Sequence, residues 1–537
     1  MSRSAFADAP TDAPAPAEGL IGACRGLIGA IEVDGLSAAE RELLGDAARA
    51  ADLDAIRSAI VAGEDPLGEL LVGTRTKLER RAIGQFLTPW PIVRHMLRQA
   101  IRPGTRAIVD AGCGSGRFAI EAARERPEIP VFAIDLDPLA TLVTRANAAV
   151  LGLRNVTVVN ESFLIWELPP IDGAVAYLSN PPYVRHHDLA ADVKQWGAET
   201  ARALGHEASS LSGLHAYFLL ATAAKARAGD RGCFITSAEW LDVGYGSLMR
   251  SLLTNGLGLE LLELLDAKSR AFDDAMTTSV VTTFEAGQSM HAAGLIVERI
   301  SALGIGASDA RPIDATALRA SQTWTRLIRS SAAPDPGHVE LGTYVRVSRG
   351  LVTGANAFFV MTRRDAAERG LEPWVEPVIS DAREVQGAAR DGGFEVDRLR
   401  VVLVAPADVP DDDVHAPLRR YLDGGVAAGH HGGYIASRRR PWWNLGRLPR
   451  PPIIATYMSR SGPVFARNPL ALPILNVAHG LYPHEPMSDG AVDTLASLLN
   501  RDAQRFVGNG RTYHGGLEKF EPREMERLLI PPLSAMS

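Results

Sequence analysis

The chain has little cysteine, little lysine and no long apolar run. Its three cysteines lie far apart in 537 residues without a CxxC pair, which argues against a disulfide framework or a cysteine-built zinc site and favours a reducing cytoplasm. No apolar run approaches the ~20 residues that span a bilayer. HExxH, GxSxG and GxxxxGK[ST] motifs are also missing, so nothing indicates a zinc protease, a serine hydrolase or a P-loop ATPase. We expect a cytoplasmic protein without a metal site.

The net charge is −7, and only five of the 56 basic residues are lysine. This balance argues against a protein that coats nucleic acid along its whole surface, but it allows a local basic groove. Arginine suits contacts to phosphate and guanine. The length predicts several domains, at about 150 residues each.

The sequence divides into four parts. Residues 1–18 are rich in Ala and Pro, and we expect a disordered tail. Residues 19–83 have helical patterns, including a capping box at Ser37 and Glu40. Residues 84–335 contain alternating strand and helix patterns. From residue 336 to 537 this alternation stops and Gly, Pro, Trp and Arg become frequent, which predicts a separate mixed α+β domain.

Seven short apolar or β-branched runs, separated by helix-length segments, predict an α/β domain. Continuous apolar strands are typical of a mostly parallel sheet with helices on both faces. In such a sheet ligands bind at the carboxyl ends of the strands. The seven runs are AIVDAG, PVFAIDLD, VTVVNES, GAVAYLSN, GCFITSA, LELLELLDA and SVVTTFEA.

The first run leads from Asp110 into a turn that contains Gly112, Gly114 and Gly116. Glycines let the backbone approach a ligand closely, and the next helix begins there. Alone, this pattern also fits a dinucleotide. However, the acid would repel a pyrophosphate and suits an ammonium group, while Asp135 ends the second run in a position to bind ribose hydroxyls. An ammonium group and a ribose together describe S-adenosylmethionine.

The fourth run ends in Ser-Asn-Pro-Pro-Tyr. Pro181 and Pro182 fix the backbone and withhold donors, so carbonyl oxygens point outward. The side chain of Asn180 adds an acceptor and Tyr183 a flat aromatic face. This combination suits a planar amino group, whose two N–H bonds would be accepted by Asn180 Oδ1 and the Pro181 carbonyl. An isolated motif of this kind also fits a proline-rich loop with a buried tyrosine.

Several motifs in this order resemble the γ-class, Taq-type adenine-N6 DNA methyltransferases and their larger restriction-linked relatives. The resemblance implies a class I, Rossmann-like methyltransferase fold and a C-terminal target-recognition domain. The motifs of the catalytic part are GQFLTPWPIVRHML (84–97), VDAGCGSG (109–116), AIDLDP (133–138), SNPPY (179–183), LHAYFL (214–219), GCFITSAEWL (232–241) and AFDDAMTTSVVTTF (271–284). Those of the C-terminal domain are VSRGLVTGANAFFV (347–360) and GRTYHGGLEKFEPREMERLLIP (510–531).

The resemblance also implies roles for individual residues. Thr88 and Pro89 would touch the methionine moiety of the cofactor, Asp110 and the glycines its amino end, and Asp135 its ribose. In the third motif the family usually has an aspartate before the phenylalanine, whereas this chain has Ser162 before Phe163. Ser162 can still accept a hydrogen bond from the cofactor's adenine, but more weakly than a carboxylate.

For the substrate, the resemblance implies that Asn180, Pro181 and Tyr183 hold the target adenine and that Phe272 contacts its other side. The expected reaction is methylation of N6 of a flipped-out adenine in duplex DNA, in a restriction–modification or related defence or epigenetic context. RNA-adenine or protein-glutamine methylation remains an alternative, as does a catalytically impaired DNA-binding module. The 83 N-terminal residues show no carboxylate–lysine nuclease pattern, so any restriction endonuclease is expected to be a separate partner.

A basic stretch in the C-terminal domain is the candidate DNA contact. From Gly424 to His484 there are seven arginines and no acid. Arginines contact phosphates or guanine edges, and aromatic side chains can stack where a base has left the duplex. A solvated basic loop with core tryptophans is the other interpretation. The predicted contacts are Arg438, Arg439, Arg440, Trp442 and Trp443.

Overall fold

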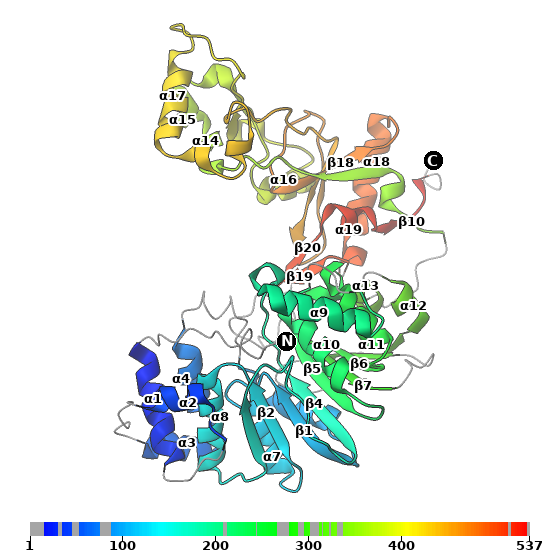
Figure 1. Ribbon diagram of the computed structural model, residues 1–537. Coiled ribbons are helices and arrows are strands. Elements are labelled where there is room, and N and C mark those ends of the chain that lie inside the picture. Colours follow the sequence, from blue (N-terminus) through cyan, green and yellow to red (C-terminus); the bar gives the residue numbers. More distant parts are fainter. Residues whose placement is uncertain are drawn as a thin grey trace. The chain divides into compact units, whose positions relative to one another are not determined.

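The computed structural model divides the chain into two compact units, residues 1–328 and 329–537 (Figure 1). The division lies a few residues before the predicted boundary between 335 and 336. None of the helices in the described part of the chain combines the length and apolar character that crossing a membrane requires. The structure describes residues 15–29, 35–45, 53–75, 87–207, 212–242, 244–265, 279–287, 295–300, 311–313, 315–321, 324–329, 337–507, 509–513 and 517–533.

A large sheet forms the centre of the first unit, and all seven predicted strands are present. Their spatial order is β3-β2-β1-β4-β5-β7-β6. Strand β7 is antiparallel to both β5 and β6, and the other neighbours among the seven are parallel. The seven-stranded, mostly parallel sheet is therefore confirmed. The strands are β1 (Thr105–Ala111), β2 (Val131–Asp135), β3 (Val156–Asn160), β4 (Ala174–Ser179), β5 (Arg231–Ser237), β6 (Leu259–Leu265) and β7 (Ser279–Glu285).

Two strands that were not predicted, β8 (Leu295–Ile300) and β9 (Arg311–Ile313), extend the sheet beyond β6 to nine strands. Strand β8 is parallel to β6, and β9 is antiparallel to β8. Both strands are added on the β6 side of the sheet. The strands β2, β1 and β4, whose carboxyl ends carry the motifs, therefore still lie side by side.

Helices cover both faces of the sheet because successive strand residues point to opposite sides. Ile108 of β1 packs with α6 (Trp90–Ala100) and α7 (Arg117–Glu125), whereas Val109 packs in the core that contains α10 (Leu214–Lys225). Both side chains are fully buried, which explains why neighbouring positions at the centre of this strand are apolar. Further helices of this unit are α8 (Pro138–Val150), α9 (Ala191–Ala203), α11 (Ser247–Thr254), α12 (Ala315–Ala320) and α13 (Trp324–Arg329).

The N-terminal helices pack on α8 and share one apolar core with it. The predicted capping box is confirmed, since Ser37 Oγ accepts from Glu40 N at 3.0 Å and Glu40 Oε2 accepts from Ser37 N at 2.6 Å. The prediction of a tail to residue 18 is wrong at its end, because a helix already begins at Ala15 and buries Ala17. These helices are α1 (Ala15–Ile28), α2 (Ala38–Leu44), α3 (Asp54–Val61) and α4 (Pro66–Gly73).

The second unit consists of short strands and helices around small cores, as the irregular sequence predicts. Its main sheet has the order β11 (Val345–Arg349), β18 (Ala478–Pro483), β15 (Ile453–Thr456) and β17 (Phe465–Arg467). The other strands are β12 (Val360–Met361), β14 (Val401–Leu403) and β13 (Val375–Pro377) in one sheet, β16 (Met458–Ser459), β20 (Leu517–Lys519) and β19 (Arg511–Tyr513) in another, and the pair β10 (Val339–Glu340) and β21 (Leu529–Ile530). The helices are α14 (Asn356–Phe359), α15 (Arg363–Glu368), α16 (Ala382–Asp391), α17 (Ala416–Ala427), α18 (Asp489–Arg501) and α19 (Pro522–Glu526).

Candidate active site

The glycine turn after β1 follows a path that only glycine adopts readily. Gly112, Gly114 and Gly116 have φ angles of 70°, 57° and 85°, in the left-handed region. A Cβ atom on Gly116 would lie 2.7 Å from Thr144 Cγ2 of α8. The turn therefore brings bare backbone to the start of α7, at the carboxyl end of β1.

Asp135 lies directly beside this turn. Its Oδ2 accepts from Gly114 N at 2.8 Å, and its Oδ1 accepts from Asp137 N at 2.9 Å. Burial and the neighbouring charge of Asp137 raise the pKa of Asp135 to about 6. The carboxylate is thus ionised at neutral pH and is positioned next to the glycine backbone, as a ribose acceptor requires.

Asp110 lies near the end of β1 and bonds the backbone of the next helix. Its side chain is fully buried, and Oδ2 accepts from Ala119 N of α7 at 2.9 Å. Oδ1 has no hydrogen-bond partner in the described part of the chain. Burial raises the pKa of this carboxyl to about 7. Asp110 therefore bonds the backbone of α7 through Oδ2. Its other oxygen, Oδ1, has no partner among the described residues.

Two different strands hold the residues at the end of β4. Ser179 Oγ donates to Ala111 O at 2.6 Å, which joins the ends of β4 and β1. Asn180 Nδ2 donates to Thr88 Oγ1 at 3.1 Å, and Asn180 Oδ1 accepts from Tyr183 OH at 3.3 Å. The Tyr183 hydroxyl lies equally close to Ile235 O of β5. The Asn180 amide is thus oriented from both sides.

The surroundings of Tyr183 carry no charge at neutral pH. Burial raises the pKa of the Tyr183 phenol, and it lowers the pKa of His215 to about 4. The two rings lie 5.8 Å apart, and Pro182 of the same turn approaches Gly112. The sequence did not indicate His215 as a site residue, because a single histidine on an apolar helix gives no local signal of a site.

Thr88 lies next to the end of β4. Its side chain is buried, and its hydroxyl bonds the Asn180 amide, so it acts on the end of β4. Pro89 is the residue before α6. Phe272 lies outside the described residues.

Ser162 and Phe163 follow β3 and are both buried. The carbonyl of Ser162 accepts from Trp166 N at 2.9 Å, which closes a turn. The Phe163 ring packs 5.4 Å from the Phe218 ring, which in turn borders Gly112. Phe163 is therefore part of the apolar wall behind the glycine turn.

The predicted DNA contacts separate into two groups. Arg439 donates to the carbonyls of Val352 and Thr353 at 2.6 and 2.7 Å, and the Trp443 indole donates to Pro406 O at 2.9 Å. These side chains support the fold of the second unit.

The ring centroids of Trp442 and Phe358 lie 5.2 Å apart in an aromatic cluster. Trp442 therefore fits the alternative interpretation, in which the tryptophans belong to the core. Arg438 and Arg440 are exposed. Arg438 stacks on the Tyr434 ring at 3.5 Å. These two arginines remain candidates for phosphate contacts.

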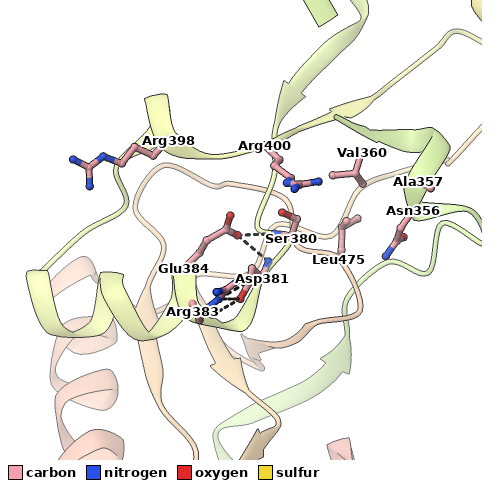
Figure 2. A pocket seen from close by; sticks show the side chains of 10 residues that line it. All are labelled: Asn356, Ala357, Val360, Ser380, Asp381, Arg383, Glu384, Arg398, Arg400 and Leu475. Atoms are coloured by element: carbon pink, nitrogen blue, oxygen red, sulfur yellow. Dashed lines mark hydrogen bonds and ion pairs between the residues drawn. The ribbon is translucent and has the colours of Figure 1, made fainter. Parts of the chain in front are cut away.

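The second unit also has a cavity of about 600 Å³ that sequence reasoning missed (Figure 2). Figure 2 shows the Arg400 guanidinium over Ser380 and toward Val360, with Asn356 across the hollow. Glu384 accepts from the backbone of Ser380 at 2.7 Å. No ion pair to Arg400 is found among the described residues, but its charge acts on the carboxyls of Asp381 and Glu384, which line the same cavity. The lining residues come from distant segments, so no local sequence pattern could reveal them.

Comparisons with known proteins agree with this geometry. Residues 108–206 match a methyltransferase domain model, and residues 320–537 match the C-terminal domain of the type II methyltransferase M.Eco57I. The chain is 38% identical to the type II methyltransferase M.XamI of Xanthomonas campestris pv. amaranthicola, over 96% of this chain and 98% of that protein. It is 24% identical to M.AccI of Acinetobacter calcoaceticus, over 85% and 87% of the two chains.

A solved structure of the type IIL restriction–modification enzyme MmeI with DNA superposes with a TM-score of 0.55 at 11% identity, over 93% of this chain and 78% of that one. This similarity shows a shared fold. The release factor glutamine methyltransferase of Cereibacter sphaeroides is 31% identical, but over only 32% of this chain and 61% of that protein.

The strand order, the glycine turn with an acid at the next strand end and the matched domain define a class I S-adenosylmethionine-dependent methyltransferase. Within that class, 38% identity to M.XamI over nearly the full length of both chains shows the family. The chain belongs to the type II methyltransferases, the DNA methyltransferases of restriction–modification systems.

Proposed function

We propose that this protein transfers the methyl group of S-adenosylmethionine to N6 of an adenine that is flipped out of duplex DNA. The observation that carries the proposal is the Asn180 amide at the end of β4. It is fixed between Thr88 Oγ1 and the Tyr183 hydroxyl, and it follows a strand that adjoins the glycine turn.

The turn at Asn180 supplies what an exocyclic amine needs in order to react. The lone pair of such an amine is delocalised into the ring, so its nitrogen is a poor nucleophile. Asn180 Oδ1 and the Pro181 carbonyl oxygen are proposed to accept hydrogen bonds from the two N–H groups of the amine, which favours a pyramidal nitrogen. Such a methyl transfer is accelerated by the orientation of the reacting groups and by preorganised dipoles.

The uncharged side chains beside Asn180 favour a neutral base over a charged substrate group. Tyr183 and His215 are both uncharged at neutral pH, and the Tyr183 ring offers a face on which a flipped base stacks. Phe272 is proposed to contact the other face of the base.

The residues around the glycine turn fit S-adenosylmethionine, which supplies the sulfonium methyl group when bound. Asp135 is proposed to accept from the ribose hydroxyls, and the unpartnered Oδ1 of Asp110 from the ammonium group. A Cβ atom on Gly112 would lie 3.1 Å from Phe218 Cε1, so glycine at this position lets the turn pack closely against the Phe218 ring. Ser162 is proposed to lie near the cofactor's adenine.

The second unit is proposed to recognise the DNA target, with Arg438 and Arg440 at the phosphates. A cognate restriction endonuclease is proposed to be a separate protein. Methylation of RNA adenine or of a protein glutamine, and a catalytically impaired DNA-binding module, are the rival functions. The release factor glutamine methyltransferases are similar to about a third of the chain only, which favours DNA.

Analysis of the methylated product tests the proposal. The purified protein is incubated with isotope-labelled S-adenosylmethionine and unmethylated bacterial genomic DNA, and the digested nucleosides are separated by mass spectrometry. We expect labelled N6-methyladenine in DNA and no label in total RNA or release factor. Labelled N4-methylcytosine, or cofactor binding without transfer, would refute the proposed reaction. Long-read sequencing of the product then gives the recognition sequence.

A further inference from the structure

A chain of hydrogen bonds, here called the positioning line, runs from the N-terminal helices to the Asn180 side-chain amide. Its members are Asp65, Arg117, Thr88 and Asn180. It begins at Asp65, the N-cap of α4, whose Oδ1 accepts from Gly68 N at 2.9 Å. Oδ2 of the same carboxylate accepts from Ser115 Oγ and from Arg117 Nε, both at 2.7 Å. The N-terminal helices are thus bonded directly to the glycine turn and to the first residue of α7.

The line continues through Arg117 to the catalytic turn. Arg117 Nη1 donates to the carbonyl of Thr88 at 2.9 Å, and Thr88 Oγ1 accepts from Asn180 Nδ2 at 3.1 Å. Arg117 also stacks on Trp90, with its guanidinium carbon 5.1 Å from the ring centroid. A planar guanidinium is therefore held by a carboxylate, a carbonyl and an aromatic face at once.

The ion pair between Arg117 and Asp65 is buried, which strengthens it. The side chains of Arg117 and Asp65 are 13% and 3% exposed, so solvent screens their ion pair much less than a surface pair. The fit around Asp65 is tight, because a Cβ atom on Gly68 would lie 2.2 Å from Asp65 Oδ2. Only glycine at position 68 allows the carboxylate to close over the helix end and reach Arg117.

The geometry points to Arg117 as a positioning residue for methyl transfer, acting through Thr88 on the orientation of the Asn180 amide, with Asp65 anchoring it to the N-terminal helices. The guanidinium fork is what allows one side chain to bond the Asp65 carboxylate and the Thr88 carbonyl together. The N-terminal helices thereby become part of the active-site framework. This inference rests on the proposed role of Asn180.

A double-mutant cycle tests the inference. The rate of label transfer from S-adenosylmethionine to genomic DNA is measured in single turnovers for the wild type, R117A, T88V and R117A/T88V. We expect R117A to lower the rate about tenfold or more, because a charge-assisted hydrogen bond to the backbone of residue 88 is removed. In the T88V background, R117A should have less than a threefold further effect, because the hydroxyl through which Arg117 acts is already absent. Multiplicative losses, or a wild-type rate in R117A, would overturn the inference.

Two further variants separate positioning from folding. R117K keeps the charge but not the fork, and we expect an intermediate rate with an unchanged melting temperature. R124A is the matched control, because Arg124 lies on the same helix with 43% of its side chain exposed, and it should keep the wild-type rate. A loss in R124A equal to that in R117A would identify a general effect on α7 and contradict the inference.

A readout that does not depend on activity distinguishes this inference from the proposed function. In protein labelled with ¹⁵N-asparagine, the side-chain amide signal of Asn180 is assigned by its absence in N180D. It should shift in R117A and T88V and stay in place in R124A. If the wild type transfers no methyl group to DNA but these shifts occur, the proposed function is wrong and the positioning line stands. An unshifted signal in R117A refutes the line itself.

Discussion

Replacing Asn180 by alanine is the most direct test of the proposed chemistry. The substitution removes the Oδ1 acceptor and the bond from Nδ2 to Thr88 Oγ1, which measures 3.1 Å. Removing one preorganised group that acts on the reacting atoms typically lowers a rate by about 10²–10³, or about 2.7–4 kcal/mol. We therefore expect N180A to lower the single-turnover rate of methyl transfer by at least about a hundredfold.

Cofactor binding should survive this change because of the strand order. Asn180 follows β4, whereas Asp135 ends β2, and β1 lies between these strands. We expect the Kd for S-adenosylmethionine, measured by calorimetry, to change less than threefold. The fold should lose about 1 kcal/mol for each of the two amide hydrogen bonds at most, which lowers the melting temperature by only a few degrees.

N180D is the matched variant, because aspartate keeps an acceptor oxygen at the same position but cannot donate to Thr88. Its rate should lie between those of the wild type and N180A. If N180A keeps activity within a few-fold of the wild type, the Asn180 amide does not hold the reacting amine. If N180A loses cofactor binding together with activity, the separation of the two sites along the sheet edge is wrong.

Three further predictions concern the cofactor and the DNA. The pKa of Asp135 is raised to about 6 and that of Asp110 to about 7, so the contribution of both carboxyls to the free energy of unfolding falls as pH rises through these values. Because both are proposed to bind the cofactor as carboxylates, affinity for S-adenosylmethionine should weaken as pH falls below about 7. Calorimetry between about pH 5 and 8 checks this, and a flat profile in the wild type would exclude both as ligands. The double variant R438A/R440A should weaken DNA binding and reduce the slope of log affinity against log salt by about 0.9 for each phosphate that the protein no longer neutralises, and an unchanged slope would remove both side chains from the interface. R400A should change which sites are found methylated by long-read sequencing, because an arginine that lines a cavity without an ion pair among the described residues suits a guanine edge. R398A is the control. The guanidinium of Arg398 pairs with Glu395 at 2.6 Å, so this variant should leave the methylated sites unchanged. Identical methylation patterns in R400A and the wild type would exclude Arg400 from target reading.

The sequence by itself determined the sheet and the position of its motifs. Strands in the interior of a mostly parallel sheet are rich in apolar and β-branched residues, so all seven predicted strands could be read from short runs of such residues. The glycine turn and the capping box at Ser37 are also local, because each depends on residues within a few positions of one another. Strands β8 and β9 were missed because Glu298 and Arg299 interrupt the apolar run of β8 and the edge strand β9 has only three residues.

Only the tertiary structure decided where the polar side chains point. One carboxylate oxygen of Asp110 bonds the backbone of α7, Arg439 bonds backbone carbonyls, and Trp442 joins an aromatic cluster. Thr88 meets Asn180 across 92 positions of the chain, and no local pattern encodes that contact. Apolar periodicity fixes which face of an element is buried, but the partner of a buried polar group is set by whichever distant donor or acceptor packing brings within about 3 Å.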